Sequence, residues 1–414
     1  MGFGRSAMDA KREFIELGRR RPRNMSELCR RFGVSRTTGY ELMRRAEVDE
    51  GEALIERSRR PHRSPQKTAE DVERRVLEVR DETHWGARKI VDLLEREEGL
   101  VVNRSTAHAI LMRSGRVSSE EGLKHTAWQR FEHPEPNDLW QMDFFGPIRT
   151  SSDSSQGLTV IDDHSRYDLC LRACVNQKTE TVQEELSHTF RRYGLPWRMT
   201  MDNGSPWGDD GSAVLTRLTA WLIRQDVRVS HSRPYHPQTQ GKDERLHRTI
   251  REELLQWVTC RDRADLQARF DSWRERYNFR RGHESMGMAR PAERYRPSTR
   301  RFTGSLKPID YGPGAITRLV DAYGKISFRG HKFHVGKGCA GLPIAIRATD
   351  LEDQFDAYFC HQAIARIDYS NSNDPRIVRG HRPNAPHSAI EATQREPSIS
   401  SPEGPERSGG GRRP

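Results

Sequence analysis

Two neighbouring segments, MDNGSPW at 201–207 and RPYHPQTQGKDERLHRTIREELL at 233–255, decide how this chain folds. In the first, the apolar-flanked run WRMTMD ends at Asp202 and is followed by Asn-Gly, which is the pattern of a strand that gives way to a turn. In the second, a polar loop rich in Pro and Gly opens into a helix just after Gly241. The two segments therefore predict a strand end and a helix start that both carry acidic residues.

The predicted helix carries a polar face. Glu244, His247, Arg248 and Arg251 recur at i, i+3, i+4 and i+7, so the sequence places them on one side. A carboxylate at a strand end and another in a first helical turn, beside a basic stripe, predict a metal site that faces a polyanion.

A third carboxylate for such a site is found upstream. Asp143 lies within LWQMDFFG, an apolar and aromatic run in which a charge is costly unless it has a partner. Asp162 and Asp163 also follow an apolar run, but a turn role with Ser165-Arg166 is preferred for them. Asp243 adjoins Glu244, and neighbours on a helix point about 100° apart, so only one of them faces the metal.

The segments QMDFFGP, TMDNGSPW and RPYHPQTQGKDERLHRTI resemble the catalytic core of retroviral-integrase-type (DDE) transposases of bacterial insertion sequences. The resemblance is strong over residues 130–300 and loose in the flanks. The second gap, between Asp202 and Glu244, is longer than is usual in that family, and the stretch 208–213 can absorb the difference. Asp243 stands where the family commonly has an apolar residue, which leaves the packing of this side chain open.

The resemblance implies an α/β, ribonuclease-H-like core in which Asp143, Asp202 and Glu244 are both the catalytic and the metal-binding residues. It implies Mg²⁺ or Mn²⁺ as cofactor, with two ions and with Asp143 shared between them. Carboxylate oxygens suit these cations. The implied partners are double-stranded DNA, as terminal repeats and as target, and further copies of the chain in a dimer or larger assembly.

Composition agrees with a polyanion partner. The 414 residues include 70 Lys and Arg against 59 Asp and Glu, a net charge of +11, although a solvated basic surface is the plainer explanation of the charge. Six cysteines without a C-x-x-C pair argue against a zinc site or a disulfide framework. With no apolar run near 18 residues and no signal-peptide pattern, the chain is expected to avoid membranes and to be cytoplasmic and nucleoid-associated.

The N-terminal part predicts two DNA-binding modules. Residues 9–46 have a helix-turn-helix pattern, with Ser35 as N-cap of a second helix that begins with Arg36, Thr37 and Thr38. A small helical bundle with a charged face is the alternative.

The second module has a similar three-helix pattern. In it Asn103 caps the last helix, and Arg104 and Ser105, followed by His108, are expected to be exposed there. We therefore predict nucleic-acid contacts by the starts of both helices. The remaining predicted contacts lie before and along the Glu244 helix: His236, Gln238, Lys242, Arg248 and Arg251.

These patterns predict a multidomain chain. The predicted parts are a helix-turn-helix module (1–56), a basic linker (57–67), a second helix-turn-helix-like module (68–131), the ribonuclease-H-like core (132–300), a small β-barrel-like domain (301–370) and a disordered tail (371–414). In the core, strands are expected at 139–148, 157–163, 167–175, 197–202 and 227–232, with helices at 179–193, 215–225 and 263–279.

The leading hypothesis is a DNA transposase that binds terminal repeats, cleaves the 3′ ends and joins them to target DNA by metal-dependent phosphoryl transfer. The alternative is a catalytically silent helix-turn-helix regulator, which has no need of the three carboxylates. A sequence-tolerant nuclease of the same fold is a third hypothesis, against which the two recognition modules argue.

Overall fold

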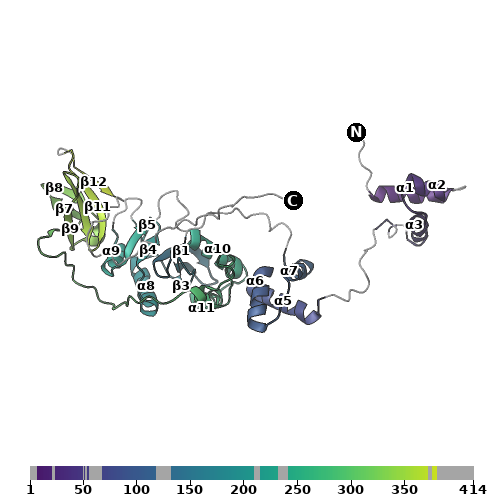
Figure 1. The fold of residues 1–414 in the computed structure, drawn as a ribbon, viewed down its shortest axis with the longest axis horizontal. Helices are drawn as coiled ribbons and strands as arrows, with labels where there is room; N and C mark the ends of the chain where they lie inside the picture. The colour runs from purple at the N-terminus through teal and green to yellow at the C-terminus, as the bar shows by residue number, and fades with distance from the viewer. Residues whose placement is uncertain are drawn as a thin grey trace, which may run out of the picture. The chain divides into compact units, whose positions relative to one another are not determined.

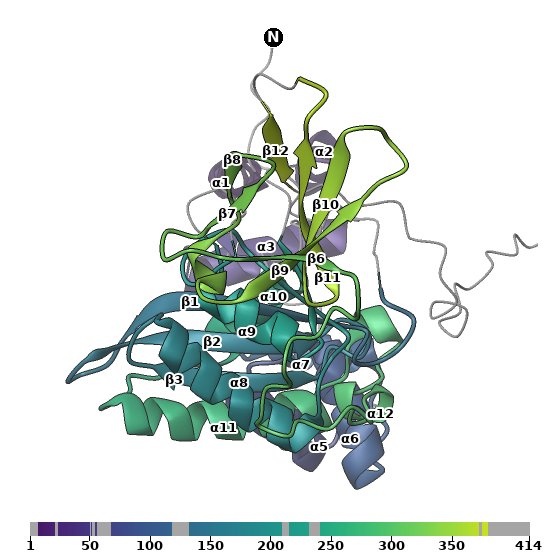
Figure 2. The same cartoon turned by 90° about the vertical axis from the view of Figure 1, so that its left-hand side faces the viewer.

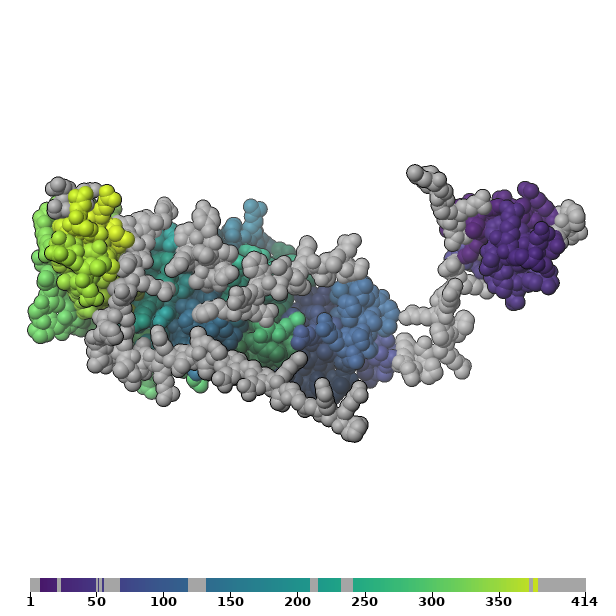
Figure 3. All heavy atoms as spheres, turned by 45° about the horizontal axis from the view of Figure 1, so that its top comes forward, coloured from purple at the N-terminus to yellow at the C-terminus, as the bar shows by residue number. Residues whose placement is uncertain are grey.

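The computed structural model describes residues 7–20, 24–49, 51, 54–55, 68–117, 132–208, 215–231, 241–371 and 375–379. Its contacts divide the chain into two compact units, residues 1–69 and 70–414. In Figures 1 and 3 the first unit is purple, and the second runs from blue to yellow. Within the described ranges, no helix is long and apolar enough to cross a membrane.

The described part of the first unit includes three helices with a helix-turn-helix arrangement. They are α1 (Ala7–Arg19), α2 (Met25–Arg31) and α3 (Arg36–Val48). Ser35 is the N-cap of α3, as predicted, because its hydroxyl accepts a hydrogen bond from the Thr38 N–H. Gly39 permits the close crossing of α2 and α3, since a Cβ at this position would lie 2.5 Å from the Cys29 sulfur.

The second unit begins with the predicted second module of three helices. They are α5 (Glu70–Thr83), α6 (Ala87–Glu98) and α7 (Arg104–Arg113). Ile90, Leu93 and Leu94 form the buried face of α6, with Ile110 and Leu111 of α7 in the same cluster. Asn103 caps α7 by accepting a hydrogen bond from the Ser105 N–H at 3.0 Å, so this prediction is also confirmed.

The core is built on a mixed five-stranded sheet with the order β3-β2-β1-β4-β5. Its strands are β1 (Leu139–Arg149), β2 (Ser154–Asp162), β3 (Asp168–Cys174), β4 (Arg198–Met201) and β5 (Arg228–His231). The first three strands are antiparallel neighbours, whereas β4 runs parallel to both β1 and β5. This sheet, with helices on both faces, confirms the expected ribonuclease-H-like fold.

Because side chains alternate along each strand, the two faces of the sheet pack against two different layers of helices. Met142 of β1 belongs to a cluster with α8 (Thr179–Tyr193) and α9 (Arg217–Arg224). Phe145 belongs to a second cluster on the opposite face, with α10 (Gly241–Ile250), the π-helical turn η3 (Arg251–Leu255) and α11 (Arg263–Phe279). Figure 2 shows α8 and α11 on either side of the strands.

The C-terminal part is antiparallel β-structure, as its alternating pattern predicts. Five strands pair in the order β12-β11-β10-β9-β6, and β7 and β8 form a separate hairpin. They are β6 (Ile316–Leu319), β7 (Lys325–Phe328), β8 (His331–His334), β9 (Pro343–Ala348), β10 (Gln354–Phe359), β11 (Gln362–Asp368) and β12 (Arg376–Arg379). Strand β12 lies beyond residue 370, where the sequence predicts a disordered tail. Its residues form a strand because they pair with β11. The prediction was therefore wrong for this strand.

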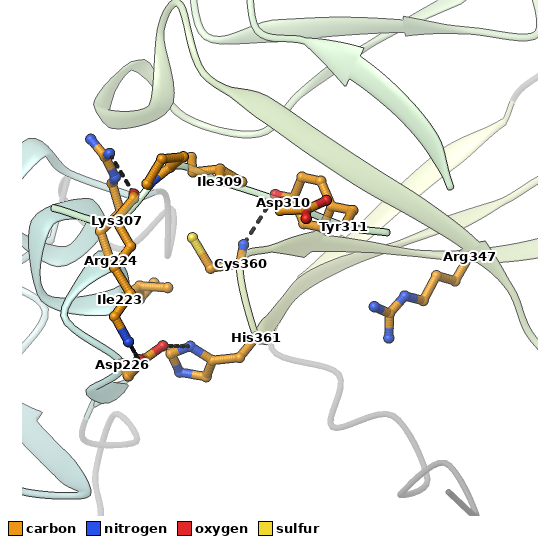
Figure 4. Close-up of a pocket in the computed structure, with 11 residues that line it drawn as sticks. Ile223, Arg224, Asp226, Lys307, Ile309, Asp310, Tyr311, Arg347, Cys360 and His361 are labelled. Carbon is orange, nitrogen blue, oxygen red and sulfur yellow. Dashed lines mark hydrogen bonds and ion pairs between the residues drawn. The ribbon is translucent and has the colours of Figure 1, made fainter. Parts of the chain in front are cut away.

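The core and the β-domain share a continuous apolar cluster and specific polar contacts. The Gln362 side chain both donates to and accepts from the backbone of Val229, so it caps the outer edge of β5. The Gly338 N–H donates to the Leu215 carbonyl, and a Cβ on this glycine would lie 2.2 Å from the Thr216 backbone. A cavity of about 320 Å³ lies at this junction. Figure 4 shows the residues that line it, among them Arg224, whose guanidinium donates to the Lys307 carbonyl.

The second module is attached to the core by a belt of ion pairs. Arg280 pairs with Glu97 at 2.8 Å, and Arg96 pairs with Glu293 at 2.8 Å. The His84 ring stacks on Trp257, with 4.1 Å between ring centroids. These pairs are half-exposed, so each contributes little and is screened by salt.

Candidate active site

Asp143 lies on β1, on the face of the sheet that α10 covers. Its cross-strand neighbour is Thr159, and its side chain is 22% exposed. Burial, with a smaller contribution from the negative charges of Asp202 and Glu244, raises the pKa of this carboxyl to about 6 against the opposing hydrogen bond from the Phe144 N–H. Asp143 is therefore a partly desolvated acid in a negative field, which favours a cation beside it.

Asp202 follows the end of β4, where the sequence predicts it. One carboxylate oxygen accepts a hydrogen bond from the Gly204 N–H at 3.0 Å, which closes the Asp-Asn-Gly turn. The Asp202 carbonyl is 2.8 Å from Nδ1 of His231 at the end of β5. These two contacts tie the carboxylate to the edge where parallel strands β4 and β5 end.

Glu244 and Asp243 occupy opposite environments in the first turn of α10. Glu244 is exposed, whereas Asp243 is completely buried. Burial raises the pKa of Asp243 well above its ordinary value, and the nearby Asp143 adds to the shift. Burial therefore favours the neutral form of Asp243, and of the two only Glu244 presents its side chain toward solvent.

The three predicted carboxylates converge closely enough for Asp202 and Glu244 to raise the pKa of Asp143. Across the described ranges, no three His, Cys, Asp or Glu side chains are grouped tightly enough to hold a metal ion. The chemistry of the donor set nevertheless fits Mg²⁺ or Mn²⁺, because carboxylates supply hard oxygen ligands. A divalent cation would also stabilise the ionised form of Asp143, which the protein alone disfavours.

His247 departs from the predicted polar face. Arg248 and Arg251 are exposed with Glu244, but His247 is buried between α10 and the sheet. Its ring stacks on Phe145 with centroids 4.6 Å apart, and its Nε2 lies 2.7 Å from the Thr159 hydroxyl. The helical spacing correctly predicted the angular position of His247 on the helix. This residue lies, however, at the edge of the exposed face of α10, where the helix packs against the strands.

Among the described residues, the predicted nucleic-acid contacts are exposed with one clear exception. Arg36, Thr37 and Thr38 at the start of α3 are exposed, as are Arg104 and Ser105 at the start of α7. Lys242 differs from the expected free cation, because it forms an ion pair with buried Asp163 and donates to the carbonyl of that residue. His236 and Gln238 lie outside the described residues.

The basic charge is concentrated in the first module and its linker. Residues 1–67 contain 17 Lys and Arg against ten Asp and Glu, whereas residues 68–117 contain nine against ten. Throughout 68–117, a segment described without gaps, every Lys and Arg except Arg104 is hydrogen-bonded or ion-paired. Of the two N-terminal modules, the first with its linker therefore carries the net positive charge that attracts a polyanion.

No sequence pattern predicts that Thr159 is a neighbour of the site or that His247 contacts the sheet. The turn role expected for Asp162 is confirmed, because its carboxylate accepts hydrogen bonds from the N–H and hydroxyl of Ser165. Thr159 gives no local signal, since its place opposite Asp143 depends on the register of β1 and β2.

Family comparisons cover most of the second unit and part of the first. Residues 133–237 and 225–291 match two models, both described as an integrase core domain. Residues 315–375 match the C-terminal domain of IS481 family transposases, and residues 38–111 match a homeodomain-like domain.

The chain is also similar to proteins of mobile elements and retroviruses. It is 22% identical over 253 residues to the 31.7 kDa protein of insertion element IS407 from Burkholderia multivorans, which covers 59% of this chain and 85% of that protein. It is 26% identical over 226 residues to the Gag-Pol polyprotein of avian reticuloendotheliosis virus, covering 49% of this chain. The chain spans less than a fifth of the length of that polyprotein, 18%.

Among solved structures, the HTLV-2 integrase catalytic core domain in complex with magnesium aligns with a TM-score of 0.30 and 13% identity. The alignment covers 39% of this chain and 97% of that domain.

Proposed function

Because the chain is an insertion-sequence transposase with an integrase-type core, we propose that it cleaves the 3′ ends of its element and joins them to target DNA. Its N-terminal modules bind the terminal repeats, and at least two copies assemble to pair the two ends. Mg²⁺ or Mn²⁺ is the cofactor of this phosphoryl transfer.

The observation that carries the proposal is the environment of Asp143. A surface carboxylate in salt bridges would have a lowered pKa, but here burial and the charges of Asp202 and Glu244 raise the pKa to about 6. Within the described residues no ion pair with Lys or Arg neutralises these three acids, and keeping them together weakens the fold unless a cation binds among them. Such sites are typical of function rather than stability.

Each residue has a role in this proposal. Asp143, Asp202 and Glu244 would hold the divalent metal, and exposed Arg248 and Arg251 would hold the DNA backbone beside them. The metal would supply activation of the attacking oxygen and charge stabilisation of the leaving oxygen. Arg36, Thr37 and Thr38 lie at the N-terminal end of α3, which is the part of a recognition helix that contacts bases and phosphates.

A joining assay tests the proposal. Purified full-length chain is incubated with Mg²⁺ or Mn²⁺ and labelled DNA that carries the repeats flanking its gene. Glu244→Gln is expected to abolish 3′ cleavage and joining while DNA binding persists. Glu252→Gln is the matched control, because Glu252 is also exposed and lies two turns further along the same helical segment.

The outcomes separate the alternatives. Specific binding of the repeats by wild type without cleavage under either metal would reject the enzyme and favour the catalytically silent regulator. Cleavage that is equally rapid on unrelated DNA would favour a sequence-tolerant nuclease. Retained joining in Glu244→Gln would show that the acid was assigned wrongly.

A further inference from the structure

A buried polar link connects the sheet to the helix that carries Glu244. The Thr159 side chain is completely buried, and His247 is 5% exposed. The Thr159 hydroxyl lies 3.2 Å from the Asp143 carbonyl oxygen and 2.7 Å from His247 Nε2. Within the described part of this interface, it joins the β1 backbone at Asp143 to α10 one turn after Glu244.

The Thr159 hydroxyl and the His247 ring make several polar contacts. The Asp143 carbonyl can only accept, so the Thr159 hydroxyl donates in that contact, and it also lies 3.5 Å from an Asp243 carboxyl oxygen. His247 Nε2 and the Thr159 hydroxyl lie 2.7 Å apart, and the ring tautomer decides which of them donates. The other ring nitrogen, Nδ1, lies 4.0 Å from an Asp143 carboxylate oxygen.

Two other kinds of contact hold α10 against the sheet. Leu246 and Ile250 pack in an apolar cluster with Phe145 and Ile161, and such packing is non-directional. Lys242 pairs with Asp163 through a long, flexible side chain at the start of the helix. A hydrogen bond requires a defined distance and angle, so the Thr159–His247 link further restricts rotation of the helix and helps to set which way its exposed first turn faces.

We propose that Thr159 and His247 are positioning residues that hold α10 in the rotation at which Glu244 faces Asp143 and Asp202. This inference rests on the proposed function, because it assigns the link a role in binding the metal. Neither side chain needs to touch the metal or the DNA. Loss of either one allows α10 to rotate and weakens the three-carboxylate site without removing a ligand.

The test is Mg²⁺ binding by the full-length chain, measured by isothermal titration calorimetry without DNA and compared with the Mg²⁺ dependence of joining. Thr159→Val keeps the shape and removes the hydroxyl, and His247→Phe keeps a ring for stacking on Phe145 but removes the N–H. We expect each variant to weaken Mg²⁺ binding by about 10–100-fold, the usual effect of losing a group that orients metal ligands. High Mg²⁺ should restore joining in both.

Two controls distinguish positioning from general damage. Thr159→Ser keeps the hydroxyl and should retain wild-type affinity. Thr249→Val removes another buried hydroxyl from α10, one that bonds only to the Arg245 carbonyl of the same helix, and should also bind Mg²⁺ normally. The double variant Thr159→Val/His247→Phe should be no weaker than either single variant, because one link is lost in all three.

Wild-type affinity in a folded Thr159→Val chain overturns this inference, and so does a double variant whose loss equals the product of the single losses. If Thr159→Val does not fold, His247→Phe decides by the same criterion. Absence of Mg²⁺ binding in wild type is a different result, because it rejects the proposed metal site itself.

Discussion

Replacing Asp143 by Asn should make the metal-free protein more stable while abolishing its activity. The carboxyl pKa is about 6 in the fold and about 4 in an unfolded chain. Because the folded pKa is raised, ionisation at neutral pH favours the unfolded state. The amide introduced by Asp143→Asn would carry no charge and would keep an oxygen to accept the Phe144 N–H bond.

The size of the effect follows from the same pKa values. Below about pH 4 the acid is protonated in both states, so wild type and Asp143→Asn should have nearly equal stability. Between about pH 4 and 6 the unfolded chain ionises first and the wild type loses stability. Above pH 6 the difference becomes constant at about 3 kcal/mol.

Urea unfolding followed by tryptophan fluorescence measures this difference, because Trp140 and Trp207 are buried in the core. The variants are compared at pH 7 and pH 3.5 in a chelating buffer, with exposed Glu252→Gln as the control that should not change. Saturating Mg²⁺ should stabilise wild type and not Asp143→Asn. Equal stability at pH 7, or a gain that persists at pH 3.5, would refute the argument that desolvation and repulsion act on this acid.

Three further predictions concern stability and domain contacts. Arg281→Gln should lower the free energy of unfolding by about 3–5 kcal/mol, because it leaves the buried Glu253 carboxylate without its partner at 2.9 Å; urea unfolding measures the loss, and a loss below about 1 kcal/mol would contradict it. Gly338→Val should separate the β-domain from the core, because the new side chain collides with the Thr216 backbone. Limited proteolysis should then cut the segment between α12 and β6 faster, and an unchanged rate would argue against this docking. Ser35→Ala should destabilise the first unit by about 1 kcal/mol through loss of the α3 N-cap. Thermal unfolding of the chain would detect this loss as a first transition at lower temperature, whereas Ser35→Asp should retain the cap.

Local signals were sufficient to predict most elements of the fold. The predicted helix at 179–193 agrees with α8, and the Ser35 and Asn103 caps are where the sequence places them. Hydrophobic periodicity and capping chemistry act within a few residues, so they can be recognised without knowing which segments meet. Strand β12 was missed because a four-residue edge strand has little pattern of its own and forms by pairing with β11.

The candidate site shows the same difference between local signals and long-range contacts. Motif and periodicity are local properties, so they were enough to assign Asp143, Asp202 and Glu244 to a strand, a strand end and a first helical turn. The burial of Asp243, the pairing of Lys242 with Asp163 and the contact of His247 with Thr159 became known only from the folded structure. These facts depend on strand register and on the rotation of α10 against the sheet, which are set by contacts between residues far apart in the chain.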